Sequence, residues 1–363
     1  MSGVDLDSLV NVADFERVAA ERLGAGPLGY YAGGAGDERT LRENVAAFER
    51  YRLWPRVLVD VSAVTTRTTV LGREIEMPVI VAPVAFQKVA HPDGEAGMAR
   101  AAAAAGTIMC LSSIATTGPA DVAAAAPGAA RWFQLYCFRD RGVTRALLDE
   151  AVAHGFEAIA LTVDAPRAGR RERDFRTGFR VDATAPAVAA AVGSDAVLTP
   201  AEIFGLVDPA LDWEDLERLA SECELPVLVK GLVRGDDAER AVEHGAAGVV
   251  VSNHGGRQLD SAPATIDALS EVVEAVGDRV DVLMDGGVRR GTDVVTALAL
   301  GAKAVLVGRP ALWGLAVAGE AGAARVLELL REEVELALVL CGAASPAALT
   351  TDLVRPGPAL GGS

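Results

Sequence analysis

The sequence predicts an α/β fold in which eight parallel strands alternate with helices and close into a (β/α)8 barrel. Short apolar runs rich in β-branched residues are followed repeatedly by Ala-rich segments with helical periodicity. Eight such units succeed one another along the chain, and eight parallel strands close readily into a cylinder. The low aromatic content, 5% in a chain that is 51% hydrophobic, suits parallel strands under Ala-rich helices. A doubly wound open sheet is the alternative, but the even repetition favours a closed TIM barrel.

The predicted elements form one domain spanning 1–363, with the barrel core at about 77–320. The predicted strands are 79–83, 108–113, 132–136, 158–164, 227–230, 248–252, 282–285 and 304–308. Before them we predict an N-terminal helical segment, a short helix that Asp14 caps and that Gly24 and Gly26 stop. A helix over 323–340 should end at Gly342, and the Pro- and Gly-rich tail after Arg355 is expected to fray.

The interval between the fourth and fifth strands is much longer than the next one, which predicts a long loop insertion at about 172–225. Its stretch 181–199 is low in charge and rich in Ala, Val and Pro, which is typical of a mobile loop. The stretch 202–219 recovers helical character. Because loops that follow barrel strands lie over the catalytic face, we expect this insertion to act as a lid.

Composition narrows the class of ligand. A net charge of −16 argues against binding to nucleic acid or to an anionic membrane surface. The four cysteines, Cys110, Cys137, Cys223 and Cys341, are too scattered for a metal site and are expected to be reduced thiols in the cytoplasm. Neither a secretory leader nor an uninterrupted apolar span is evident. The sequence also lacks HExxH and P-loop motifs, so we expect no metal and no P-loop nucleotide.

The stretch 249–260 carries the strongest functional signal. Three valines give way at Ser252 to Asn253, His254, a Gly-Gly pair and Arg257, as in a buried strand that feeds a close-approaching loop. A proton acceptor and a planar cation three residues apart can face the same small ligand. The alternative is a surface loop with a chance histidine. The chain has only four His, however, and this one follows a strand-like run.

Polar residues end almost every predicted strand, where barrels place their catalytic groups. They are Ser112, Gln134, Tyr136, Thr162, Asp164, Lys230, Ser252, His254, Arg257, Asp285, Arg289, Gly308 and Arg309. Buried polar groups cost desolvation free energy unless they are paired, so a protein with a purely structural role would not need so many of them, which favours a functional site. The glycines and arginines after the last two strands predict a phosphate site, although a Gly-Gly turn also occurs for steric reasons. Lys230 either reaches solvent or is a fixed charge, and Asp164 either caps a helix or orients His254.

The motif Ser252-Asn253-His254-Gly255-Gly256-Arg257-Gln258-Leu259-Asp260 resembles the active-site signature of the FMN-dependent 2-hydroxy-acid oxidases and dehydrogenases, which include glycolate oxidase, lactate oxidase, mandelate dehydrogenase and hydroxymandelate oxidase. The resemblance extends over nearly the whole chain. Its further motifs are Tyr30-Tyr31-Ala32-Gly33-Gly34, Ala82-Pro83, His91-Pro92-Asp93-Gly94-Glu95, Leu111-Ser112-Ser113, Phe133-Gln134-Leu135-Tyr136, Leu161-Thr162-Val163-Asp164, Gly169-Arg170-Arg171, Lys230-Gly231, Asp285-Gly286-Gly287-Val288-Arg289 and Gly308-Arg309.

The resemblance implies FMN as cofactor and a role for each matched residue. His254 would be the base, oriented by Asp164, and Arg171 and Arg257 would bind the substrate carboxylate. Tyr30, which could by itself be a hydrophobic cap at a turn, would contact substrate with Tyr136. Lys230 would stabilise the reduced flavin. The remaining flavin contacts would come from Ala82, Pro83, Val84, Ser112, Gln134, Thr162, Ser252, Asp285, Gly286, Gly287, Arg289, Gly308 and Arg309.

Two departures from glycolate oxidases bear on the substrate. Ile114 stands where those enzymes carry Trp, and Ala168 is small where a larger apolar residue is common. We therefore predict a larger (S)-2-hydroxy acid, with mandelate or 4-hydroxymandelate ahead of lactate. Oxygen, yielding hydrogen peroxide, a quinone or another carrier would reoxidise the flavin, and both hydride and carbanion routes stay open. The resemblance also implies a homo-oligomer, a tetramer or octamer.

Two alternatives come from other functional classes. The first is a non-redox isomerase or lyase built on a phosphate-binding barrel, which would share the phosphate site. It gives no reason for His254, Arg257 and Arg171 together. The second is a catalytically silent barrel that serves as a binding partner, against which the intact His254, Asp164 and Tyr136 argue.

Overall fold

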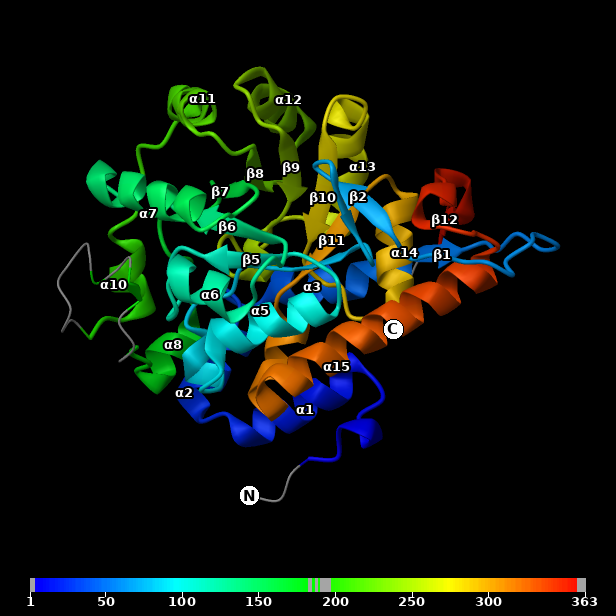
Figure 1. Ribbon diagram of the computed structural model, residues 1–363, viewed down its shortest axis with the longest axis horizontal. Coiled ribbons are helices and arrows are strands. Elements are labelled where there is room, and N and C mark those ends of the chain that lie inside the picture. The colour runs from blue at the N-terminus through cyan, green and yellow to red at the C-terminus, as the bar shows by residue number, and fades with distance from the viewer. Residues whose placement is uncertain (1–3, 182–184, 187–188, 190–196, 358–363) are drawn as a thin grey trace.

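The computed structural model describes residues 4–181, 185–186, 189 and 197–357, and its centre is a closed barrel of eight parallel strands (Figure 1). The strands are β4 (Val79–Val81), β5 (Met109–Ser112), β6 (Arg131–Leu135), β7 (Ile159–Thr162), β8 (Val227–Leu232), β9 (Gly248–Val251), β10 (Asp281–Asp285) and β11 (Ala304–Val307). Each pairs in parallel with its neighbours in the sequence, and β11 closes the cylinder by pairing Val305 with Val79. The predicted (β/α)8 barrel is therefore confirmed.

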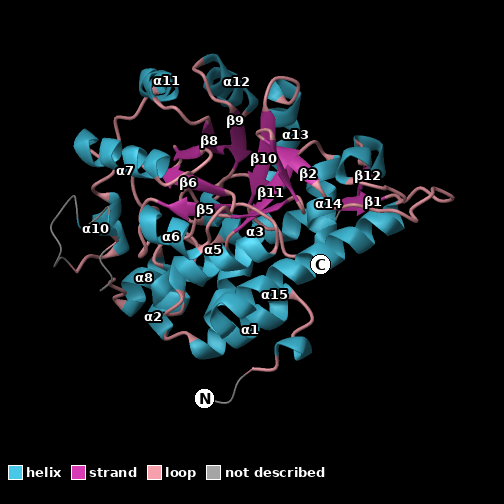
Figure 2. Cartoon of the chain, in the orientation of Figure 1, coloured by secondary structure: helices cyan, strands magenta, loops and turns pink. Residues whose placement is uncertain are grey.

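Helices surround this barrel (Figure 2). They are α1 (Val12–Arg22), α2 (Ala25–Ala32), α3 (Arg39–Ala46), α4 (Gln87–Ala90), α5 (Gly94–Ala104), α6 (Pro119–Ala125), α7 (Arg141–Ala153), α8 (Glu172–Thr177), α10 (Pro200–Phe204), α11 (Trp213–Glu222), α12 (Gly235–Glu243), α13 (Thr265–Val276), α14 (Gly291–Ala299) and α15 (Arg309–Cys341). Within the described ranges, no helix has the length and apolar character needed to cross a membrane.

The strands are buried on both faces, so the core has two layers. Ile80, Trp132 and Leu228 belong to an inner cluster, whereas their strand neighbours Val79 and Phe133 pack in the larger cluster shared with the helices. This alternation follows from the two-residue period of a strand, and it explains why each run is continuously apolar.

A β-hairpin covers the end of the barrel at which the strands begin. It consists of β2 (Thr68–Val70) and β3 (Arg73–Ile75), and Val70 and Ile75 are buried in the inner cluster. The backbone N–H of Leu71 donates to Asp281 at the start of β10 over 2.8 Å. The hairpin thus covers one end of the barrel, and a cavity opens at the other end, where the carboxyl ends of the strands lie. The hairpin was not predicted.

The N-terminal helical segment is present, but its N-cap residue and the role of Gly26 differ from the prediction. Asn11, not Asp14, caps α1, and its side chain accepts from the Asp14 N–H at 3.0 Å. The helix α1 ends at Arg22 with Leu23 as its C-cap, directly before Gly24, as predicted. Gly26 ends no helix, because it lies inside α2, of which Gly24 is the N-cap. Burial of Tyr30 and Tyr31 on α2 outweighs the poor helix propensity of its glycines.

The C-terminal prediction also needs correction. The last helix, α15, starts at Arg309 rather than near 323, and it breaks at Ala318 and Gly319, where Asp93 accepts from the Glu320 N–H at 3.0 Å. Gly342 ends it in a left-handed conformation (φ 70°), as expected. Of the tail predicted to fray after Arg355, Pro356 pairs with Tyr51 between β12 (Val354–Pro356) and β1 (Tyr51–Leu53). Residues 358–363 lie outside the described residues, so the prediction for them is not tested.

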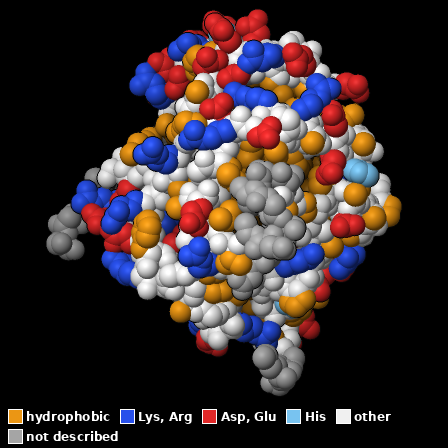
Figure 3. Space-filling view, turned by 90° about the vertical axis from the view of Figure 1, so that its left-hand side faces the viewer, with side chains coloured by type: hydrophobic (Ala, Val, Ile, Leu, Met, Phe, Trp, Pro, Cys, Tyr) orange, Lys and Arg blue, Asp and Glu red, His pale blue; other side chains and the backbone are white. Residues whose placement is uncertain are grey.

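The inserted segment contributes α8, α10 and α11 between β7 and β8. Much of the predicted mobile loop at 181–199 falls outside the described residues, so its role as a lid stays a prediction. The predicted helical stretch 202–219 corresponds to two helices, α10 and α11. Over α11 and α12, basic and acidic side chains are interspersed rather than gathered into a basic patch (Figure 3). Arg141, at the start of α7, contacts Asp208 and also Asp215 of α11.

Candidate active site

A cavity opens at the carboxyl ends of the barrel strands. Its walls come from Tyr30, Tyr31, Ala82, Pro83, Val84, Ala85, Ser112, Ile114, Gln134, Tyr136, Thr162, Arg171, Phe204, Lys230, His254, Gly255, Arg257, Asp285, Gly286, Gly287, Val288, Arg289, Leu306, Val307, Gly308, Arg309, Pro310 and Leu312. Of the residues predicted for the site, Asp164, Ser252 and Ala168 do not line it. Asp164 and Ser252 contact residues that do, whereas Ala168 lies on the loop beyond β7.

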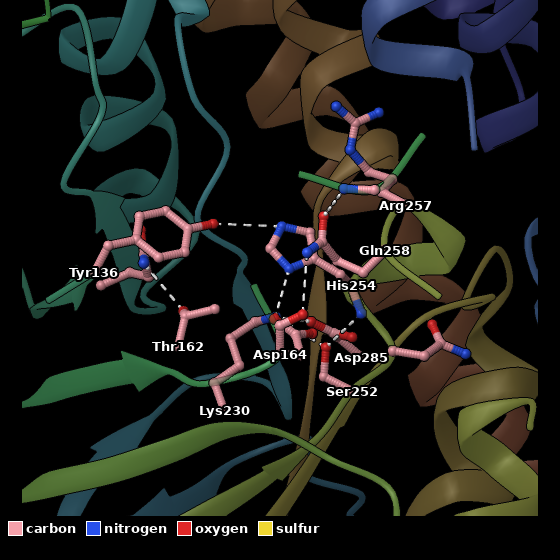
Figure 4. Close-up of polar contacts among 12 residues, drawn as sticks. Tyr136, Thr162, Asp164, Lys230, Ser252, His254, Arg257, Gln258 and Asp285 are labelled. Carbon is pink, nitrogen blue, oxygen red and sulfur yellow. Dashed lines mark hydrogen bonds and ion pairs between the residues drawn. The ribbon is translucent and has the colours of Figure 1, made fainter. Parts of the chain in front are cut away.

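His254 is held by both of its ring nitrogens. Its Nδ1 lies 2.9 Å from Asp164 Oδ1, and its Nε2 lies 3.5 Å from the Tyr136 hydroxyl (Figure 4). The Asp164 interpretation as a histidine partner is thus supported over a helix cap. His254 itself adopts a left-handed backbone (φ 58°), which is strained for a residue with a side chain and is typical of functional sites.

The surrounding loop stabilises that conformation. The Asn253 side chain accepts from the Gly256 N–H at 3.1 Å and exchanges two hydrogen bonds with Asn44 of α3, at 2.8 and 2.7 Å. The His254 N–H donates to the Ser252 hydroxyl at 3.1 Å. Asn44 therefore links the N-terminal segment to the loop after β9, which no local pattern in the sequence reveals.

Burial and charge set the protonation states of this group. Burial lowers the pKa of His254, although Asp164 opposes the shift. Burial raises the pKa of Asp164, but the contacts with His254 and Lys230 outweigh it, so that the net pKa is lowered. Burial, followed by the charge of Asp164, raises the pKa of Tyr136 well above its usual range. At neutral pH the site thus combines a neutral imidazole, a carboxylate and a protonated phenol.

Two guanidinium groups lie beside His254. Arg171 Nε donates to the Arg257 carbonyl at 3.3 Å, and Arg257 donates to the carbonyls of Tyr30 and of Gly33, the latter at 3.0 Å. Burial, followed by the charge of Arg257, lowers the pKa of Arg171 to about 10. Neither group forms an ion pair with a carboxylate among the described residues. A buried guanidinium, Arg171, and a partly buried one, Arg257, neither of them in such an ion pair, suit an external carboxylate.

A polar row crosses the barrel at the strand ends (Figure 4). Ser112 donates to Gln134 at 3.1 Å, and Gln134 donates to Thr162 at 3.0 Å. Lys230 Nζ lies 2.9 Å from both the Ser252 hydroxyl and Asp285 Oδ2. Lys230 is only 4% exposed, so it is a fixed charge and does not reach solvent.

Beyond this row, the ends of β10 and β11 carry the positively charged Arg289 and Arg309 next to Asp285. Asp285 Oδ1 is buried without a partner among the described residues, and Gly286 and Gly287 follow with φ of 95° and 82°. Burial lowers the pKa of Arg289 and also that of Arg309. A Cβ at Gly287 would lie 1.9 Å from the Asn44 carbonyl oxygen. The second glycine of this turn is therefore also required for steric reasons, as the alternative interpretation of the Gly-Gly pair held.

The guanidinium groups of Arg289 and Arg309 differ in how many hydrogen bonds they donate within the protein. The Arg309 guanidinium donates to the carbonyls of Tyr31, Gly255 and Gly33 at 2.9, 3.0 and 2.9 Å. The Arg289 guanidinium donates only to Val288 within the described part of the chain, at 2.9 Å. Arg309 therefore ties the N-terminal segment to the loop after β9, and Arg289 retains free donors at the cavity.

The sequence missed part of the cavity wall. The missed residues are Tyr31, Ala85, Phe204, Gly255, Val288, Leu306, Val307, Pro310 and Leu312. Most are neighbours of predicted residues within the same motifs. Phe204 is different, because it comes from α10 of the insertion and packs against Tyr136 with ring centroids 5.4 Å apart. No local signal marks it.

Comparison with known proteins identifies the family. The model of the FMN-dependent dehydrogenase family matches residues 19–356. The chain belongs to this family. L-lactate oxidase of Nostoc sp. is 49% identical over 352 residues, covering 93% of this chain and 95% of the relative. Glycolate oxidase 3 of Arabidopsis thaliana is 49% identical (93% of each chain), and human 2-hydroxyacid oxidase 1 is 46% identical (97% and 98%).

Solved structures support the same fold for this FMN-dependent dehydrogenase. Mandelate oxidase with (S)-4-hydroxymandelic acid has a TM-score of 0.90 at 42% identity, covering 96% of this chain and 99% of the other. The flavin-binding domain of baker's yeast flavocytochrome b2 has a TM-score of 0.88 at 37% identity, covering 97% and 88%.

The cavity fits the family's cofactor. Asp285 offers an unused buried oxygen to a hydroxyl group, and Arg289 offers free guanidinium donors to a phosphate. The row from Ser112 to Lys230 supplies hydrogen-bonding side chains for a flat polar ring. FMN carries each of these groups, a ribityl chain, a phosphate and an isoalloxazine.

Proposed function

We propose that this enzyme oxidises an (S)-2-hydroxy acid larger than glycolate to the 2-oxo acid, with oxygen as the electron acceptor and hydrogen peroxide as the product. The observation that carries the proposal is the neutral His254 imidazole, held by Asp164, beside the unneutralised Arg171 and Arg257. A base next to two cations suits a substrate that bears both a removable proton and a carboxylate. The family match favours this redox chemistry over a non-redox isomerase.

The chain's own residues would bind and orient the substrate. Arg171 and Arg257 bind its carboxylate, and the protonated Tyr136 donates a hydrogen bond to it. His254 Nε2 accepts the proton that the substrate loses, from its hydroxyl in a hydride route or from its reacting carbon in a carbanion route. Asp164, 2.9 Å from Nδ1, stabilises the imidazolium that results. When bound, FMN supplies the two-electron acceptor for the oxidation.

The cofactor would lie across the strand ends. We assign its ring to Ala82, Pro83, Val84, Ser112, Gln134, Thr162, Lys230 and Ser252, and its ribityl chain and phosphate to Asp285, Gly286, Gly287, Arg289, Gly308 and Arg309. Lys230 is held in place by Asp285 and Ser252. Burial lowers the pKa of Lys230, but Asp285 outweighs burial and the net pKa is raised. Its fixed charge would stabilise negative charge on the ring.

The substrate's side chain would extend toward Ile114. This residue is 3% exposed and lines the cavity, and its side chain is smaller than the Trp that glycolate oxidases carry there. Each additional methylene that such a pocket accepts contributes ~1–3 kcal/mol to discrimination. Ala168 does not line the cavity, so Ile114 alone supports the proposal of a larger substrate.

The decisive experiment compares substrates and acceptors on the purified yellow protein. We expect 2-hydroxy acids to bleach the flavin without oxygen, and kcat/KM to rank mandelate above lactate and lactate above glycolate. Under air, we expect one peroxide per substrate oxidised. A preference for glycolate would contradict the substrate proposal, and turnover with a quinone but not with oxygen would contradict the oxidase proposal.

We also propose a cytoplasmic homo-oligomer, a tetramer or octamer. The segment after β1 exposes apolar side chains, with Val57 80% and Leu58 103% exposed, and its Arg56 N–H donates to the Cys341 carbonyl at the end of α15. Exposed apolar segments of this kind favour association. All four cysteines are free, which is consistent with a reducing compartment. Light scattering on the purified protein gives the mass of the assembly.

A further inference from the structure

The side chain of Gln258 is fully used, although the proposed reaction assigns it no role. Its Nε2 donates to the carbonyls of Asp164 and Arg167 at 3.0 and 2.9 Å. Its Oε1 accepts from the Gly169 N–H at 3.1 Å and from Arg171 Nη2 at 3.2 Å. A primary amide has two donors and two good acceptor positions. All four are satisfied, and a flipped amide would set donors against donors.

These contacts tie three parts of the site together. Gln258 follows Arg257 on the loop after β9, and it lies beside His254 with its amide directed toward Asp164 (Figure 4). Asp164, Arg167 and Gly169 lie on the loop after β7. Gln258 therefore joins the loop that carries the base to the loop that carries its carboxylate partner, in addition to the contacts His254–Asp164 and Arg171–Arg257.

The acceptor that Gln258 offers to Arg171 is uncharged, and this matters as much as its position. Arg171 is 4% exposed and has no carboxylate partner among the described residues, so it needs acceptors that hold the guanidinium in one orientation. Gln258 and the Arg257 carbonyl provide these without a negative charge. A glutamate here would pair with Arg171 internally and would repel an arriving carboxylate.

We infer that Gln258 is a positioning residue that orients Arg171 through a neutral acceptor and thereby reserves the guanidinium charge for the substrate's carboxylate. The inference rests on the proposed function, because it assumes that Arg171 binds that carboxylate. Gln258 would not touch the reacting atoms. Its role would be in specificity, because it would help the site to select an anion over a neutral analogue of equal shape.

The test uses Gln258→Glu, which replaces the amide nitrogen with an oxygen, so that it adds one charge and removes the two hydrogen bonds donated to Asp164 and Arg167. In the FMN-loaded enzyme, binding of the 2-oxo acid product and of its neutral amide is titrated by the change in flavin absorbance. We expect affinity for the anion to fall roughly tenfold or more, because like charges within a site repel strongly. Affinity for the amide should change less than threefold. Equal losses for both ligands, or an unchanged anion affinity, would overturn the inference.

Two further variants separate charge from orientation. Gln258→Met has a similar length but neither hydrogen bonds nor charge, and we expect it to weaken anion binding less than Gln258→Glu does. If both weaken it equally, charge plays no part. Leu259→Glu adds the same charge at the next residue, which is exposed, and anion affinity should stay within about twofold because solvent screens that charge.

The same measurements separate a failure of the proposed function from a failure of the role inferred for Gln258. Each variant must retain its flavin absorbance and thermal unfolding temperature, which shows that it is folded and loaded. If the parent enzyme oxidises no 2-hydroxy acid, the proposed function fails. If the parent is active but Gln258→Glu binds the anion as the parent does, only the role of Gln258 fails.

Discussion

The Nδ1 atom of His254 lies 2.9 Å from Oδ1 of Asp164, in a site where burial keeps the imidazole neutral while contacts with His254 and Lys230 keep the carboxylate ionised. The contact fixes the orientation of the ring, so that Nε2 points at the Tyr136 hydroxyl and the cavity. Because the same carboxylate can stabilise an imidazolium, the pair is suited to accept a proton during the reaction.

Replacing His254 with Asn should abolish most turnover while FMN stays bound. The variant keeps a polar side chain but has no group that accepts a proton near neutral pH. General bases contribute about 10²- to 10⁴-fold to rate, and we expect a loss of flavin reduction of that size in stopped-flow mixing with substrate. Flavin absorbance after gel filtration is the control for cofactor retention. Reduction at the parent's rate would show that His254 is not the base.

The pH dependence of kcat/KM should follow His254. Burial stabilises the neutral imidazole, so protons bind only below the usual pKa of 6.5. Activity should therefore persist as the pH falls through 6.5 and decline below it. Asp164→Asn removes the charge that opposes this shift, so its acidic limb should move to still lower pH. An acidic limb above 6.5 in the parent enzyme would be inconsistent with this assignment.

Arg289→Met should weaken FMN binding. The guanidinium of Arg289 has free donors at the cavity, and a hydrogen bond to a charged group contributes about 2 kcal/mol, or roughly thirtyfold in Kd. Fluorescence titration of the apoprotein with FMN measures the change. Arg290→Met is the matched control, because Arg290 is exposed and pairs with Glu333, and its Kd should match the parent's. Equal Kd values for both variants would remove Arg289 from the phosphate site.

Ile114→Trp should shift selectivity toward glycolate. A Trp at this buried wall position fills the space proposed for the substrate's side chain, and overpacking typically costs 1–3 kcal/mol. We expect the ratio of kcat/KM for mandelate over glycolate to fall by about tenfold or more. Ile114→Val keeps the space open and is the control. If the Trp variant leaves the ratio unchanged, Ile114 does not contact the substrate's side chain.

The family resemblance, the strand order and most of the site could be predicted from the sequence. The barrel strands are continuous apolar runs that end in polar residues, and those ends converge because parallel strands point the same way. His254, Arg257, Lys230 and Asp285 were found in this manner. The boundaries outside the barrel were less predictable, since burial of Tyr30 and Tyr31 stabilises a second helix, α2, that contains Gly26.

Other features required the tertiary structure, because they join residues far apart in the sequence. Phe204 reaches the cavity from the insertion, and Asn44 holds Asn253 across 209 positions. The ion pair with Asp285 decided that Lys230 is fixed inside the barrel and does not reach solvent. The sequence by itself thus determined which chemical groups stand at the strand ends. Only the packing of distant segments decided how those groups are oriented and which of them carry charge, since burial and neighbouring charges exist only in the folded chain.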